Sequence, residues 1–103
     1  MSDTTVSRAS VATERGTRYG KQLVSHLGRK SVGGWDEASG SGTLDMGDGA
    51  ARVTLQSTTD ALVITVEAAD TDIATYQDVV GRHLERFGER DGLRVHWVRS
   101  EAR

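Results

Sequence analysis

Two segments of the chain carry the apolar periodicity of a helix, and a stretch that alternates like β-strands separates them. The first helical segment starts at a cap on Thr13 or Thr17, ends near Arg29, and has an apolar side formed by Tyr19, Leu23, Val24 and Leu27. The second covers residues 71–87 after the N-cap candidate Asp70, and its apolar side contains Ile73, Tyr76, Val80, Leu84 and Phe87. Two such helices need an apolar sheet face to cover them.

Five segments have the composition of strands: 6–12, 43–46, 51–56, 62–68 and 93–98. Segment 62–68 is apolar on both sides, which predicts a central strand. The glycine-rich stretch before residue 43 is interpreted as a loop that contains Trp35, and residues 57–60 as a turn. The order β-α-β-β-β-α-β predicts an α+β fold: a two-layer sandwich with a mostly antiparallel sheet and both helices on one face.

Length and composition predict one domain, residues 1–103, with flexible ends at 1–5 and 100–103. The 13 basic and 15 acidic residues are spread along the chain, so no nucleic-acid partner is expected. No apolar run has the length of a membrane span, and the first residues lack a secretory signal. A cytoplasmic protein without membrane association is therefore expected.

One edge of the first helix carries most of the polar side chains that could bind a ligand. Tyr19, Gln22, His26 and Lys30 follow one another at spacings of 3, 4 and 4 residues, which aligns them along the helix. His83 borders the apolar face of the second helix and is a further candidate. Together these groups could orient one small polar or anionic ligand. The alternative is that His26 is a partly buried residue that is bonded internally and has a structural role.

The two helical segments share a pattern of a tyrosine, a Leu or Val four residues later, and a His-Leu pair three residues after that. It begins at Tyr19 and again at Tyr76, so that His26 and His83 hold matching positions. The pattern fits either two related β-α halves or a coincidence between amphipathic helices.

Metal and cofactor chemistry has little support in the sequence. The chain has no cysteine, which excludes thiolate zinc sites and disulfides. Its histidines, His26, His83 and His96, have no ligand spacing among themselves. No tightly held metal, no cofactor and no catalytic residue are predicted.

The segment from Arg18 to Lys30 resembles a bacterial family catalogued as domain of unknown function 2218, whose helix reads Tyr-x-Lys-Gln-Leu-x-x-His-x-x-His-Lys. The second half is similar as well, from Glu67-Ala68 through Gln77-Asp78-Val79-Val80 and His83-Leu84 to Trp97. The resemblance implies a small bacterial domain, with iron or siderophore utilisation as a context. Arg29 stands where the family has its second helix histidine, so a metal site built on that pair would be impaired here.

Three functions remain open at this point. The first is a non-catalytic binding or accessory domain with a small-ligand or protein partner, in the iron context that the resemblance implies. The second is a small enzyme that uses Tyr19 and His26. The third is an interaction module that forms a homodimer through an open sheet face or edge. A pocket near His26 would favour the first two, and a flat apolar sheet face would favour the third.

Overall fold

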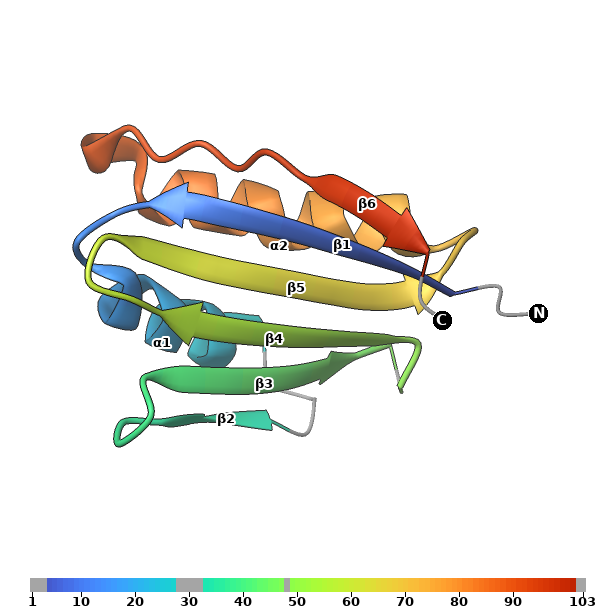
Figure 1. Ribbon diagram of the computed structural model, residues 1–103, viewed down its shortest axis with the longest axis horizontal. Helices are drawn as coiled ribbons and strands as arrows, with labels where there is room; N and C mark the ends of the chain where they lie inside the picture. Colours follow the sequence, from blue (N-terminus) through green and yellow to red (C-terminus); the bar gives the residue numbers. More distant parts are fainter. Residues whose placement is uncertain (1–3, 28–32, 48, 102–103) are drawn as a thin grey trace.

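The computed structural model describes residues 4–27, 33–47 and 49–101. It contains one antiparallel sheet in the order β2-β3-β4-β5-β1-β6 (Figure 1). The strands are β1 (Thr4–Ala12), β2 (Gly33–Asp36), β3 (Ser41–Met46), β4 (Ala51–Ser57), β5 (Ala61–Ala69) and β6 (Val98–Glu101). Strand β5 pairs with β4 on one side and β1 on the other, which confirms its predicted central position.

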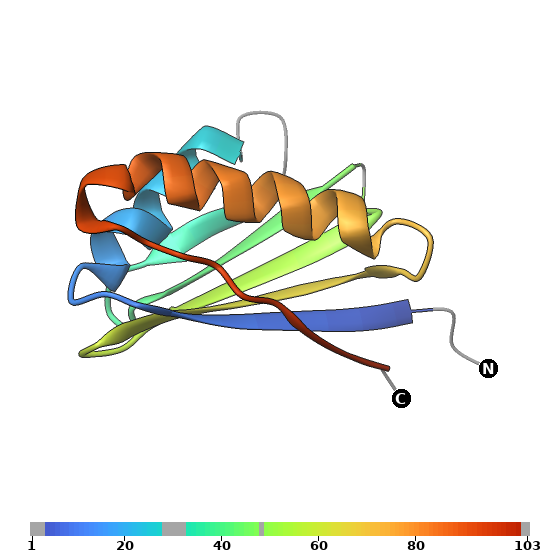
Figure 2. The same ribbon diagram turned by 90° about the horizontal axis from the view of Figure 1, so that it is seen from above.

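The helices α1 (Gly16–Leu27) and α2 (Ile73–Phe87) lie on the same face of the sheet (Figure 2). Helix α1 covers strands β2 to β5, and α2 covers β5 and β1. This confirms the predicted two-layer α+β sandwich. The opposite face is open and polar at its centre, where Thr43, Thr54 and Thr65 are register partners on neighbouring strands.

Both helix starts differ in detail from the prediction. The Thr13 hydroxyl accepts a hydrogen bond from the Arg15 backbone N–H at 3.0 Å, while the Thr17 hydroxyl donates to Ser57. Helix α2 starts at Ile73 with Asp72 at its N-cap position, so the prediction of Asp70 as the cap is wrong. The Asp70 carboxylate instead accepts a hydrogen bond from the Thr5 hydroxyl and so links the end of β5 to β1.

The segment interpreted as a loop around Trp35 is strand β2. Trp35 is opposite Gly42 in the β2–β3 register, on the side of the sheet that α1 covers. Its indole ring fills the space beside two glycines: a Cβ on Gly20 would lie 2.5 Å from the ring, and one on Gly42 would lie 2.6 Å from it. The absence of two Cβ atoms thus allows a large side chain to sit between the sheet and the helix.

The predicted strand at 93–98 forms only in part, because β6 begins at Val98. Leu93, Val95 and Trp97 do alternate toward one side, but they pack beside Gly81 and Gly88 instead of pairing in the sheet. A Cβ on Gly88 would meet Leu93, and one on Gly81 would lie 3.1 Å from Trp97 Nε1. The Val95 N–H donates to the Glu85 carboxylate at 3.0 Å instead of to a strand.

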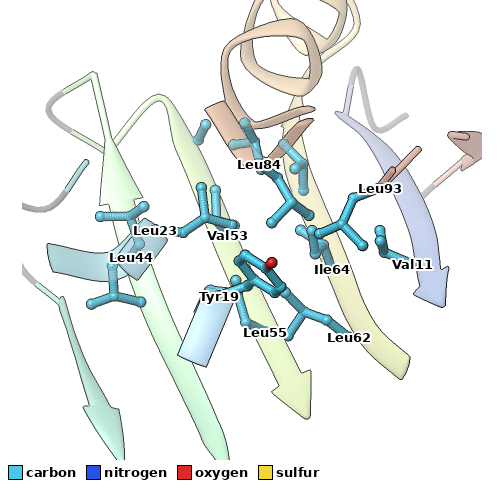
Figure 3. Close-up of a cluster of buried hydrophobic side chains, with 14 of the residues drawn as sticks. Val11, Tyr19, Leu23, Leu44, Val53, Leu55, Leu62, Ile64, Leu84 and Leu93 are labelled. Atoms are coloured by element: carbon cyan, nitrogen blue, oxygen red, sulfur yellow. The ribbon is translucent and has the colours of Figure 1, made fainter. Parts of the chain in front are cut away.

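The core lies between the sheet and the two helices. Leu23, Ile73, Val80 and Leu84 from the helices are almost fully buried against Val53, Leu55, Leu62, Ile64 and Val66. Leu27 and Phe87 pack on this cluster while partly exposed. Figure 3 shows Tyr19 and Leu84 from the two helices in the same cluster. Within the described ranges, no helix combines the length and the apolar character that a membrane crossing requires.

The first and the last strand, β1 and β6, are neighbours in the sheet. Thr5 and Glu101, which were predicted to lie in flexible ends, are register partners in the β1–β6 pair. The segments 1–3 and 102–103 lie outside the described residues, as do Asp48, Arg29 and Lys30.

Candidate functional site

Tyr19 connects helix α1 to the short 3₁₀-helix η1 (Glu89–Asp91) that follows α2. The side chain is 6% exposed, and its hydroxyl donates a hydrogen bond to the Asp91 carboxylate. This bond, followed by burial and the negative charge of Asp91, raises the pKa of Tyr19 above its ordinary value. Arg15 and Arg18 act in the opposite direction. Tyr19 is therefore a neutral phenol at physiological pH, and its hydroxyl proton forms the hydrogen bond to Asp91.

A cavity of about 320 Å³ opens beside this contact, between the start of α1 and the end of α2. That volume is at the lower end of the range of small-molecule sites. The walls combine charged, polar and aromatic side chains: Arg15, Arg18, Tyr19, Gln22, Phe87, Arg90 and Asp91.

Positive charges outnumber negative ones around this cavity, because three arginines and one carboxylate line it. Its single carboxylate, Asp91, already accepts the Tyr19 hydroxyl and lies 3.6 Å from an Arg15 guanidinium nitrogen. Arg18 and Arg90 form no ion pair within the described part of the chain. Two guanidinium groups thus border the cavity without forming an ion pair with any acidic residue that the structure describes. Guanidinium is the side-chain group best suited to a carboxylate or phosphate, which it can bind through two parallel hydrogen bonds.

A larger hollow of about 580 Å³ runs between α2 and the segment 93–97. Its charged groups already have partners inside the protein. Arg82 binds Asp78 at 3.0 Å, and Glu85 accepts the Val95 N–H. This hollow therefore offers a ligand fewer free charges than the arginine-lined cavity.

The structure separates the residues predicted to form one edge. Tyr19 and Gln22 both line the cavity, and Gln22 is exposed with no hydrogen bond to another described residue. His26 is exposed rather than partly buried, and its ring packs against α2. Lys30 lies outside the described residues. Tyr19 and His26 have different contacts, so the pairing that the enzyme hypothesis requires is not formed among the described side chains.

His26 and His83 meet across the two helices. Their ring centroids are 5.1 Å apart, with the planes tilted by 47°. The Phe87 ring lies 5.4 Å from His26 and 6.2 Å from His83. The Nδ1 atom of His83 is 2.7 Å from the Val79 carbonyl oxygen and donates to it. The matching histidines of the two helical patterns are thus in contact, with Phe87 against both.

Sequence reasoning missed the arginines of the cavity. Arg15, Arg18, Tyr19 and Gln22 follow the spacing i, i+3, i+4, i+7, so the helical periodicity could have placed the two arginines beside the predicted edge. The contributions of Arg90 and Asp91 carried no such signal, because they depend on how η1 folds back onto α1.

Replacing Tyr19 by phenylalanine tests the Tyr19–Asp91 contact through its pH dependence. A group whose pKa is raised by folding stabilises the protein below its unfolded pKa, and that contribution disappears as pH rises through the folded-state pKa. At neutral pH we expect Tyr19→Phe to lower the free energy of unfolding by about 1.5 kcal/mol, the lower end of the range for a hydrogen bond to a charged group, because the Asp91 side chain is partly exposed. The difference from wild type should shrink above the ordinary pKa of tyrosine, near 10.

Urea denaturation at a series of pH values measures this difference. Asp91→Asn provides the control, because it removes the charged acceptor and should weaken the same alkaline dependence. A difference between wild type and Tyr19→Phe that stays constant up to the strongly alkaline range would contradict the assigned contact.

The fold and the cavity define a small α+β domain with an arginine-lined recess between its helices. Residues 8–98 match the model of a family described as an uncharacterised protein conserved in bacteria, DUF2218, and the chain belongs to this family. The structure is similar to the NMR structure of PA4090 from Pseudomonas aeruginosa, with 28% identity and a TM-score of 0.69. That similarity covers 90% of this chain and 94% of the other. No curated protein matches the chain.

Proposed function

We propose that this domain is a non-catalytic binding protein for a small organic anion, a carboxylate with an apolar or aromatic body. The observation that carries the proposal is that Arg18 and Arg90 border one cavity without an acidic partner among the described residues. Two permanent positive charges that border one cavity favour an anion, because each guanidinium can form a charge-assisted hydrogen bond to it.

The other walls determine which anion fits. Phe87 supplies an apolar ring surface, and the exposed Gln22 amide offers both a donor and an acceptor. An anion with a hydrophobic part would use these groups as well as the arginines, whereas inorganic phosphate would use the charges alone. Tyr19 and Asp91 hold the α1 and η1 sides of the cavity together.

The alternatives have weaker support. A homodimer through the open sheet face would be expected to bury an apolar surface, but the centre of that face carries threonines. Val98, at 72% exposure, is the one large hydrophobic side chain that is mostly exposed among the described residues. The iron or siderophore context rests on the family resemblance alone. A cavity of about 320 Å³ also suits a small organic acid better than a whole metal chelate.

Titration with benzoate, followed by isothermal calorimetry, tests the proposal. The wild-type protein should bind benzoate saturably at one site and bind inorganic phosphate more weakly. Arg18→Gln and Arg90→Gln should each weaken benzoate binding about tenfold or more, because a hydrogen bond to a charged group contributes roughly 1.5–3 kcal/mol. Both arginines are exposed, so these variants should remain folded.

Arg94→Gln is the matched control, because Arg94 is an exposed arginine that does not line the cavity. It removes the same charge and should leave the affinity within about twofold. Equal weakening by Arg94→Gln would mean that net charge attracts the anion, and the proposal would fail. Absence of saturable binding by small aromatic and aliphatic carboxylates would also contradict it.

A further inference from the structure

We propose that His26 and His83 form an open two-histidine site for a borderline divalent transition-metal ion, such as Zn²⁺, Ni²⁺ or Cu²⁺. Imidazole nitrogen is a preferred ligand for these ions. The site joins α1 to α2 and differs from the i, i+3 histidine pair of the family helix, which Arg29 interrupts. It shares Phe87 with the arginine-lined cavity but uses none of the arginines.

The separation of the two rings suits a shared ion. Histidine nitrogens bind zinc at about 2.0–2.1 Å, and a tetrahedral ion held by two imidazoles puts their ring centroids about 5 Å apart. The observed separation is 5.1 Å. The ring planes are tilted by 47°, so the two imidazoles do not stack face to face, an arrangement in which their nitrogens could not point toward a common ion.

The hydrogen bond of His83 prepares that ring for metal binding. A carbonyl oxygen can only accept, so the contact with Val79 O fixes the ring proton on Nδ1. The lone pair of the neutral ring is then on Nε2, which forms no hydrogen bond with another described residue. A histidine ligand whose second nitrogen donates to a backbone carbonyl is the usual arrangement around protein-bound metals.

The surroundings predict an exchangeable ion. His26 is exposed and His83 is partly exposed, so an ion can enter from solvent and keep water or an added ligand in its other positions. No third His, Asp or Glu joins the pair within the described ranges. Two protein ligands hold an ion less firmly than the three or four of catalytic and structural zinc sites. The site is therefore compatible with the expectation that no metal stays tightly bound.

Calorimetric titration of the tag-free protein with Ni²⁺, and separately with Zn²⁺, at pH 7.5 tests the proposal. We expect one saturable site in the wild-type protein. His26→Gln should weaken binding at least tenfold, and His83→Gln should do the same. Because His26 is exposed, His26→Gln should stay folded. The test therefore stays decisive even if His83→Gln lowers the stability of the protein.

His96→Gln is the matched control, since His96 is the remaining histidine of the chain and is exposed. It should leave the affinity within about twofold. A second readout follows the imidazole ¹⁵N signals during a Zn²⁺ titration, where Nε2 of His83 should shift and Nδ1 should remain protonated. The proposal is overturned if no saturable binding occurs up to millimolar ion, if His26→Gln binds as tightly as wild type, or if His96→Gln weakens binding equally. Arg18→Gln should still bind the ion, which separates this site from the anion site.

Discussion

Replacing Leu84 by alanine is expected to destabilise the domain by about 2–5 kcal/mol, the usual range for a buried leucine. Leu84 is fully buried in the C-terminal half of α2, where it packs between the helix layer and the sheet (Figure 3). The substitution removes buried apolar volume and leaves a cavity that the surrounding strands can fill only in part. For a domain near 100 residues, each kcal/mol lowers the Tm by roughly 4–8 °C.

Urea denaturation followed by circular dichroism measures the loss. Val98→Ala is the control, because Val98 is 72% exposed and its truncation should change the stability by less than about 0.5 kcal/mol. A loss below about 1 kcal/mol for Leu84→Ala, with an unchanged slope of the transition, would contradict the packing of α2 on the sheet.

The second large effect is expected for Gly42→Ala, which should cost about 1–3 kcal/mol by overpacking. The new methyl group would lie 2.6 Å from the Trp35 ring and 3.2 Å from both the Gly34 carbonyl oxygen and Val24 Cγ2. Because backbone atoms border it as well as the ring, Trp35 cannot relieve the clash by moving alone.

Gly34→Ala makes a close control in the neighbouring strand, because its Cβ would meet no atom within 4 Å. It should leave the stability unchanged or raise it slightly, since alanine restricts the unfolded chain. Combining Gly42→Ala with Trp35→Ala should cost less than the sum of the two single losses, because the second change removes the ring that the first one meets. Additive losses would mean that Trp35 does not occupy the space beside Gly42.

Much of the fold could be predicted because local patterns and tertiary packing agree. Helical spacing identified α1 and α2, and alternation identified β3, β4 and β5 within one or two residues. Strand β2 was missed because its two glycines carry no alternation, and its pairing depends on how Trp35 fits between Gly20 and Gly42. The segment 93–97 was assigned to a strand because packing against Gly81 and Gly88 selects the same alternation as a sheet.

The candidate site could be predicted only along one helix. Periodicity placed Tyr19 and Gln22 on one edge, and both line the cavity. The partner of Tyr19 is 72 residues away in the sequence, and no local pattern identifies Asp91 as that partner. The contact between His26 and His83 likewise depends on how the two helices pack, although the repeated Tyr and His-Leu pattern had marked both positions.

Arg18 and Arg90 are proposed to bind one anion together, and an NMR titration with benzoate measures this joint binding most directly. The side-chain Nε–H signals of the arginines report on each guanidinium separately. We predict that the Arg18 and Arg90 signals shift together and saturate with one dissociation constant, while the Arg94 signal stays in place. Equal small shifts of all arginine signals, or no saturation of the Arg18 and Arg90 signals, would contradict the account.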